Sequence, residues 1–426
     1  MPLLYDIGTG LYHLGIRAAA PFLPKAKQWV DGRRGQWERL EAKSAALQGC
    51  LWMHCASVGE FEQGRPVLEA IKAQRPHLPI LLTFFSPSGY EARKSLASAR
   101  DDGFVTHVEY LPPDGRTNAR RMLRLVKPRA AIFVKYEFWY HHLVTLANAG
   151  VPTFLVSAIF RPKQTFFRWF GATHRAMLRC FQQLFVQDEA SRALLASIDV
   201  MNVTVSGDTR FDRVAAIAQA NEDLPIAAGF KADGTLLVGG STWPKDEALL
   251  LEAFGLLKSA PKCMIVPHEL TEDHLLAIEA TYPKPLARWS ELEGATQENI
   301  GAVLGTESRA TLLVDRMGLL ARLYKYGSIA YIGGGFGDGI HSLLEAAAWG
   351  VPVIFGPNHH KFAEARGLIA AGGGYAISDA RELKTVLEEL LTDASALEAA
   401  STAARTYVEE RTGATAKVVA VVMQAL

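Results

Sequence analysis

Two glutamates follow predicted strands, where a carboxylate can act on a bound substrate. Glu60 closes the run WMHCASVGE, in which Ser57 and Gly59 suit a tight turn that opens a helix. A carboxylate at this point can take the proton of an attacking hydroxyl group, so Glu60 is a candidate general base. A glutamate in a first helical turn also simply complements the helix dipole, and that interpretation stays open.

The second glutamate, Glu137, lies in the run KYEFW directly after a strand predicted at 130–134. An acidic residue between aromatic side chains at a strand end is typical of surfaces that bind carbohydrates or lipid headgroups. The alternative is an ion pair between Glu137 and Lys135 or an arginine. Both interpretations stay open on the residues alone.

A glycine-rich stretch, GGGFGDGIHSLLE at 333–345, lies between a predicted strand and a predicted helix. Its amides can approach a phosphate, and the helix N-terminus favours negative charge, although a glycine-rich loop alone is weak evidence. We expect His341 and Glu345 on one face of that helix, because they are four residues apart. Glu345 could then accept hydrogen bonds from both hydroxyls of a ribose. The alternative, a surface glutamate, is disfavoured by the apolar residues around it.

Three shorter runs follow other predicted strands of the C-terminal half, namely GGSTW at 239–243, PHE at 267–269 and RMG at 316–318. Each alone is compatible with an ordinary turn. Because the carboxyl ends of parallel strands meet at one edge of a sheet, the runs together with the glycine-rich stretch predict one site.

Short β-rich runs alternate with helical stretches, which predicts doubly wound parallel sheets. We expect strands at 51–56, 80–85, 130–134, 153–157 and 183–186, and then at 235–239, 263–266, 311–314, 328–332 and 352–355. The fold class is therefore α/β, with two Rossmann-like domains that face a central cleft.

The domain boundaries follow from this pattern. We expect an apolar and basic membrane-association segment at 1–45, a Rossmann-like domain at 46–206 and a linker at 207–232. A second Rossmann-like domain at 233–405 and a C-terminal helix at 406–426 follow, and packing of this helix on the first domain is one option.

Composition excludes several classes of protein. With 49% hydrophobic and 21% charged residues, the chain is globular rather than disordered, and its net charge of +1 gives no reason to expect nucleic acid as a partner. The four cysteines are scattered without metal-ligand spacing, which indicates a reducing compartment. No Asp-x-Asp metal motif is found.

The first 24 residues are apolar but interrupted by Asp6, His13 and Arg17, so they do not predict a spanning helix. Leu4, Ile7, Leu11 and Leu14 fall on one helical face, and basic residues follow. Such a segment suits the membrane interface beside anionic headgroups. A helix packed on its own domain is the equal alternative.

Taken together, these motifs resemble the transferases of 3-deoxy-D-manno-oct-2-ulosonic acid (Kdo). The resemblance rests on His54–Glu60, on Glu137 within 136–139, and on 240–242, 267–269, 317–318 and 339–345, and it continues through 352–357 to Asn358 and Phe362. It covers about residues 50 to 370 together with the N-terminal segment. The combination is specific, although no single motif is.

The resemblance implies a GT-B architecture, CMP-Kdo as donor, a lipid A precursor (lipid IVA) as acceptor, and inversion at the anomeric carbon without a metal or cofactor. It implies lipopolysaccharide biosynthesis at the cytoplasmic face of the bacterial inner membrane. Catalytic roles fall on Glu60 and Glu137, and acceptor contacts fall on Ser57, Gly59, Lys135 and Tyr136. The implied nucleotide-sugar pocket contains Gly240, Ser241, Thr242, Pro267, His268, Glu269, Met317, Gly318, Gly337, His341, Ser342 and Glu345.

Two departures from the family pattern affect these expectations. Ser342 stands where the family commonly has asparagine, which puts one ribose or phosphate contact in question. The run at 160–167 replaces a basic, serine-rich stretch and leaves the acceptor contacts open. The alternatives are another GT-B enzyme, such as a UDP-sugar transferase or epimerase, and a catalytically inactive GT-B-like binding protein.

Overall fold

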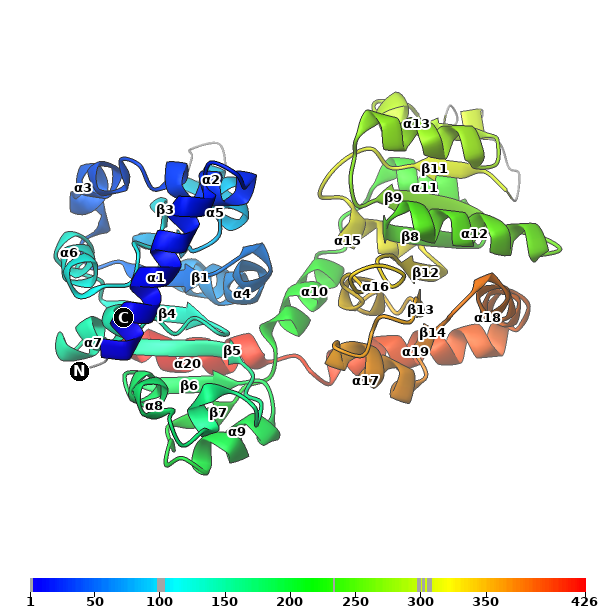
Figure 1. Ribbon diagram of the computed structural model, residues 1–426. Helices are drawn as coiled ribbons and strands as arrows, with labels where there is room; N and C mark the ends of the chain where they lie inside the picture. The colour runs from blue at the N-terminus through cyan, green and yellow to red at the C-terminus, as the bar shows by residue number, and fades with distance from the viewer. Residues whose placement is uncertain (1–2, 98–103, 233, 297–299, 301–302, 305–308) are drawn as a thin grey trace. The chain divides into compact units, whose positions relative to one another are not determined.

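The computed structural model of the chain describes residues 3–97, 104–232, 234–296, 300, 303–304 and 309–426. It divides into two compact units (Figure 1). The first contains residues 1–213 together with 412–426, and the second contains residues 214–411. Each unit is a parallel seven-stranded sheet covered by helices, so the predicted α/β class with Rossmann-like sheets is confirmed.

The first sheet has the strand order β3-β2-β1-β4-β5-β6-β7. Its strands are β1 (Leu51–Cys55), β2 (Ile80–Phe84), β3 (His107–Tyr110), β4 (Ala130–Val134), β5 (Thr153–Ala158), β6 (Gln183–Val186) and β7 (Val203–Val205). Its helices are α1 (Leu3–Ala19), α2 (Pro24–Gly32), α3 (Gln36–Leu47), α4 (Val58–Gln74), α5 (Pro87–Arg93), α6 (Arg116–Val126), α7 (Tyr140–Asn148), α8 (Ala172–Leu178) and α9 (Glu189–Ala196). All five predicted strands are present, while β3 and β7 at the two edges were not predicted.

Strand β1 lies at the centre of this sheet and is buried along its whole length. Its side chains alternate between two apolar cores, with Trp52 on one face and Leu51 and Met53 on the other. Its register with β4 aligns Leu51 with Ala130 and His54 with Phe133, so the two strands end side by side. A near-continuous apolar sequence is what a central parallel strand requires.

The last helix, α20 (Ala414–Ala425), belongs to the first unit and packs on α4. Val418 and Val422 are fully buried in the same core as Ile71 of α4, and such valines contribute roughly 1.5–3 kcal/mol each. The carboxylate of Asp212 accepts hydrogen bonds from the amides of Gly413 and Thr415, which satisfies the helix start.

The second sheet has the strand order β10-β11-β9-β8-β12-β13-β14. Its strands are β8 (Leu236–Thr242), β9 (Lys262–Pro267), β10 (Leu286–Arg288), β11 (Thr311–Leu313), β12 (Ile329–Ile332), β13 (Val353–Phe355) and β14 (Gly374–Ala376). Its helices are α11 (Pro225–Lys231), α12 (Pro244–Leu256), α13 (Glu272–Thr281), α15 (Leu320–Leu323), α16 (Leu344–Ala347), α17 (Ala363–Ala371), α18 (Ala380–Thr392) and α19 (Ala394–Glu409). The five predicted strands are again present, and the edge strands β10 and β14 were not predicted.

Residues 207–232, expected as a linker, contain α10 (Thr209–Ala220) and α11. The division between the units falls inside α10, after Arg213, and again after Arg411. Helical structure in this stretch reflects apolar residues that pack, since Phe211, Val214 and Phe230 are all buried.

Candidate active site

Whereas the runs 267–269 and 316–318 lie at the ends of β9 and β11, the longest predicted motifs in each sheet lie at the carboxyl ends of the two strands where the strand order reverses. In the first unit these strands are β1, followed by Ser57 and Glu60, and β4, followed by Lys135–Trp139. In the second unit they are β8, which carries Gly240–Thr242, and β12, followed by the glycine-rich stretch. Open α/β sheets bind their ligands at such reversal points.

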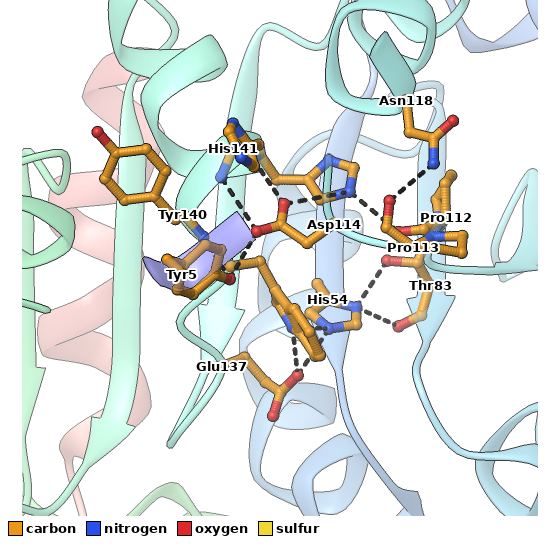
Figure 2. A network of polar contacts seen from close by, with 12 residues as sticks. Tyr5, His54, Thr83, Pro112, Pro113, Asp114, Asn118, Glu137, Tyr140 and His141 are labelled. Atoms are coloured by element: carbon orange, nitrogen blue, oxygen red, sulfur yellow. Dashed lines mark hydrogen bonds and ion pairs between the residues drawn. The ribbon is translucent and has the colours of Figure 1, made fainter. Parts of the chain in front are cut away.

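Glu137 is buried and held by two N–H donors (Figure 2). Its Oε2 lies 2.8 Å from Nε2 of His54, on β1, and 2.7 Å from the indole nitrogen of Trp139. Glu137 is thus fixed by a histidine and a tryptophan, rather than by the lysine or arginine that its flanking residues suggested.

His54 has polar partners at both ring nitrogens. Thr83 Oγ1 accepts a hydrogen bond from the Trp52 indole at 2.8 Å, and Nδ1 of His54 lies 3.0 Å from this hydroxyl and 3.1 Å from the Thr83 carbonyl oxygen. Nε2 lies 2.8 Å from Oε2 of Glu137 and 3.1 Å from the Trp139 indole nitrogen. A chain of buried hydrogen bonds thereby runs from Trp52 through Thr83 and His54 to Glu137.

Glu60 lies in the first turn of α4, as predicted, and its side chain is part of a capping box. The Ser57 amide donates to Glu60 Oε2 at 2.9 Å, so the capping interpretation is correct for that oxygen. Burial and then the nearby charge of Glu137 raise the pKa of Glu60 above its ordinary value. A carboxylate with a raised pKa is a stronger base, so capping and proton transfer are compatible.

The four expected acceptor residues lie within three residues of Glu60 or Glu137 in the sequence. Tyr136 is partly exposed, and the charges of Arg161 and Glu60 both act on its hydroxyl, which places the three side chains near one another. Lys135 adopts a φ of 64°, a left-handed conformation that costs energy and is frequent at functional sites. Gly59 is exposed in α4, and nothing lies within 4 Å of an added Cβ except Ser57 Oγ at 4.0 Å.

In the second unit, three rings stack at the carboxyl ends of β8, β9 and β12. The His268 ring lies 4.8 Å from that of Trp243 and 4.3 Å from that of His341, at small interplanar angles. The Trp243 indole lies 3.1 Å from Nε2 of His341 and donates to it, so the proton of the neutral imidazole is on Nδ1. Burial and the neighbouring His268 lower the pKa of His341.

Five amides of the glycine-rich stretch donate hydrogen bonds within the protein, three of them to the loop itself. Gly333 donates to Gly240, Gly334 to Asp246, Gly337 and Gly339 to Gly334, and His341 to Gly333. The expectation that the amide of Gly337 faces a phosphate is therefore wrong for this arrangement. Asp246 explains part of this, because its buried carboxylate accepts from Trp243, Gly334 and Tyr331 and so joins β8 to the loop.

The expected helical pair of His341 and Glu345 is also wrong. Helix α16 begins only at Leu344 and has four residues, so His341 lies in the loop before it. The loop is closed by the hydrogen bond from His341 to Gly333 and by Gly339, whose φ is +144°. A helix of one turn adds little dipole to a phosphate site.

Glu345 nevertheless lies at this end of the sheet. Its charge, after burial, contributes to raising the pKa of Tyr324 well above the usual value, so the two side chains are close. The Tyr324 hydroxyl lies only 1.9 Å from the position that a Cβ on Gly240 would occupy. Gly240, Tyr324 and Glu345 therefore converge, and only glycine fits at Gly240.

The other expected pocket residues differ in burial and in their hydrogen bonds. The Thr242 hydroxyl is buried and donates to Glu247 at 2.9 Å, so it is not a phosphate donor here. Ser241 is half-buried with a left-handed φ of 52°. Pro267 is buried at the end of β9, whereas Glu269, Met317, Gly318 and Ser342 are all exposed in loops.

Several residues of the site were not predicted as such. His54 and Trp139 lie inside quoted motifs, and their signal was a polar group in a buried strand and an indole beside a glutamate, both of which need partners. Thr83, Trp243, Asp246 and Tyr324 gave no comparable signal. Among the described residues no helix is long and apolar enough to cross a membrane.

Comparisons with known proteins show which family the chain is similar to. Residues 30–213 match the model of a family described as 3-deoxy-D-manno-octulosonic-acid transferase (kdotransferase). The 3-deoxy-D-manno-octulosonic acid transferase of Aquifex aeolicus is 30% identical over 351 residues, which are 81% of this chain and 87% of the relative. The enzyme of that name from Bordetella pertussis is 29% identical over 96% of this chain and 97% of its own.

Solved structures extend the comparison to the fold. A putative UDP-N-acetylglucosamine 2-epimerase of Listeria monocytogenes has a TM-score of 0.54 at 13% identity, over 88% of this chain and 96% of its own. MurG of Acinetobacter baumannii has a TM-score of 0.52 at 13% identity, over 88% and 99%. At this identity the likeness shows the fold alone, and it confirms the expected GT-B class.

Proposed function

Because this chain belongs to the 3-deoxy-D-manno-octulosonic acid transferase family and is a glycosyltransferase, we propose that it moves Kdo from CMP-Kdo onto a lipid A precursor with inversion at the anomeric carbon. The observation that carries the proposal is the Glu60–Glu137 pair, in which burial and then the charge of the fixed Glu137 carboxylate raise the pKa of Glu60. A base with a raised pKa is what a weakly nucleophilic sugar hydroxyl needs.

In the proposed reaction, Glu60 takes the proton of the acceptor hydroxyl group. At the same time the oxygen of that hydroxyl group bonds to the anomeric carbon of Kdo. The bond from that carbon to the phosphate oxygen breaks, and CMP leaves with the electron pair. Attack from the face opposite the leaving phosphate inverts the anomeric centre. Ser57 is bonded to Glu60, and the charge of Glu60 acts on Tyr136; these two residues and Lys135 are the proposed contacts to the acceptor sugar.

We assign CMP binding to the second unit. The stacked rings of Trp243, His268 and His341 offer a flat surface to a base or ribose, and Glu345 can accept ribose hydroxyls. Because the amides of Gly337, Gly339 and His341 donate within the loop, we assign the phosphate to side chains. Nδ1–H of His341 and the hydroxyls of Ser241 and Ser342 are the proposed donors, and they would stabilise the charge that develops on the leaving group.

We also propose that the protein works at the cytoplasmic face of the inner membrane. Helix α1 exposes Leu3, Leu4, Ile7, Leu11 and Leu14, each at least half exposed, and Trp169 and Phe170 project from another loop of the same unit. Exposed apolar residues beside arginines and lysines are typical of interfacial binding. The lipid acceptor favours this location, since each acyl methylene exposed to water costs about 0.8 kcal/mol.

A transfer assay tests the activity directly. The full chain, radiolabelled CMP-Kdo and a tetraacylated lipid A precursor should give labelled lipid, and no labelled product would refute the proposal. Thermal unfolding with CMP and with UDP separates it from a UDP-sugar enzyme of the same fold. CMP should raise the melting temperature more than UDP, and a larger effect of UDP would favour the other enzyme class.

A further inference from the structure

A buried carboxylate outside the proposed catalytic pair joins the first helix of the chain to the segment that carries Glu137. Asp114 follows β3 and is only 6% exposed. Its Oδ2 accepts a hydrogen bond from the Tyr5 hydroxyl of α1 at 2.6 Å and from the amide of His141 at 3.1 Å. Its Oδ1 accepts from the amide of His142 at 3.1 Å.

These contacts act on the start of α7, which comes directly after Glu137 and Trp139. The first amides of a helix have no partners within it, and Asp114 supplies partners for two of them. The Tyr5 hydroxyl also accepts the amide of Tyr140 at 3.2 Å, and His141 is paired through Nε2 with Asp6. Figure 2 shows Tyr5, Asp114, Tyr140 and His141 in the same view as the His54–Glu137 contact.

Asp114 is itself held rigidly. It follows Pro112 and Pro113, whose carbonyls accept hydrogen bonds from His142 Nε2 at 3.1 Å and from Asn118 Nδ2 at 2.9 Å. Burial and the charge of Asp114 raise the pKa of Tyr5, so its hydroxyl keeps its proton and remains a donor. The hydrogen bond between Tyr5 and Asp114 therefore links α1 to the loop that follows β3.

We propose that Tyr5 and Asp114 are positioning residues, which set the Glu137 segment through α7 and make its geometry depend on the seating of α1. The inference rests on the proposed function, because it uses the transfer reaction and the lipid-facing role of α1. The outer face of α1 is apolar and exposed, while its inner face carries Tyr5 and Asp6. One helix thus meets lipid on one side and the Glu137 segment on the other.

The test uses Tyr5→Phe in the full chain, with Tyr12→Phe as the matched control. Tyr12 lies on the same helix, is half exposed and stacks on Phe85. Tyr5→Phe should leave binding to vesicles of anionic phospholipid unchanged. It should lower kcat about 10-fold with acceptor in vesicles and in detergent, because a shift of about 1 Å in a positioned group lowers the rate by up to about 100-fold. KM for CMP-Kdo should stay constant, because the donor is assigned to the other unit.

Hydrogen exchange gives a readout that does not depend on activity. The amides of His141 and His142 should exchange about 10-fold faster in Tyr5→Phe and at the wild-type rate in Tyr12→Phe. The inference would be overturned if Tyr5→Phe changed neither kcat nor the exchange of the His141 and His142 amides. It would also be overturned if Tyr5→Phe lowered turnover only in proportion to a loss of vesicle binding. An inactive wild-type chain would refute the proposed function instead, and the exchange result would still decide whether the link exists.

Discussion

Glu137 and Glu60 lie at the carboxyl ends of two neighbouring strands, β4 and β1, and the charge of the first raises the pKa of the second. The two carboxylates have different surroundings. Glu137 is buried between His54 and Trp139, whereas Glu60 is only partly buried and is held by the Ser57 amide. This difference supports our proposal that Glu137 supplies a fixed charge and that Glu60 transfers the proton.

Glu60→Gln should lower transfer about 10²–10⁴-fold, the usual effect of losing a general base. Its affinity for CMP, measured by calorimetry, should stay at the wild-type value, because the nucleotide is assigned to the second unit. Glu62→Gln is the control, since Glu62 lies in the same helix and pairs with Arg93. Near-normal turnover in Glu60→Gln would remove Glu60 from the mechanism.

Glu137→Gln should shift the pH dependence of the remaining activity. The pKa of Glu60 is raised first by burial and then by Glu137, so the acid limb of kcat/KM lies above the ordinary carboxyl value of 4.5. Removing the negative charge favours ionisation of Glu60 and moves this limb to lower pH. Glu62→Gln should leave the limb in place, and an upward shift in Glu137→Gln would contradict the assignment.

Glu345→Ala should weaken CMP binding by roughly 1.5–3 kcal/mol if the carboxylate holds ribose hydroxyls. The variant should also discriminate less between CMP and 2′-deoxy-CMP, and calorimetry with both nucleotides measures the two effects. Glu398→Ala, on the exposed face of α19, serves as the control in the same unit. Equal CMP affinity in both variants would exclude Glu345 from the pocket.

Gly240→Ala should destabilise the second unit by about 1–3 kcal/mol, because the new methyl group would overlap the Tyr324 hydroxyl. Gly255→Ala is the opposite case, since nothing lies within 4 Å of its Cβ position inside α12. That substitution should stabilise by about 0.5–1 kcal/mol through the higher helix propensity of alanine. Urea unfolding measures both, and a stabilising effect of Gly240→Ala would show that the Tyr324 contact is not tight.

Leu11→Glu should reduce binding to anionic vesicles about 10-fold or more, since burying a leucine contributes roughly 1.5–3 kcal/mol. Leu11 is 63% exposed on α1, so the substitution leaves the core intact. Leu256→Glu, at an exposed leucine of the second unit, is the control. If the two variants bind vesicles equally well, the proposed role of α1 at the membrane is wrong.

The strands that sequence analysis missed have one physical property in common. β3, β7, β10 and β14 are the edges of their sheets, and each is only three or four residues long. An edge strand has one strand neighbour and less burial, so its sequence need not be apolar, as HVEY in β3 and LAR in β10 show. Inner strands such as β1 and β4 are buried along their whole length and are almost entirely apolar, and all of these were predicted.

Sequence analysis predicted where the candidate site lies, but it did not predict most of the hydrogen bonds within the site. The motifs after β1, β4, β8 and β12 lie where the strand order reverses, as parallel strands require. The hydrogen bonds of Thr242 with Glu247 and of Gly334 with Asp246 depend on exact geometry, which residue types do not determine. The contact between Tyr5 and Asp114 spans 109 residues and has no local signature.

Helix α20 has a consequence for synthesis and for protein engineering. The core beneath α4 contains Val418 and Val422, so the first unit cannot complete its packing until residues 414–425 have left the ribosome. The second unit, continuous from 214 to 411, has all its residues at an earlier moment. The first unit therefore begins to be synthesised before the second unit but can complete its fold only after it. A fragment that ends near residue 213 would expose the apolar surface of α4, and a useful expression fragment of the first unit would need α20 joined back to it.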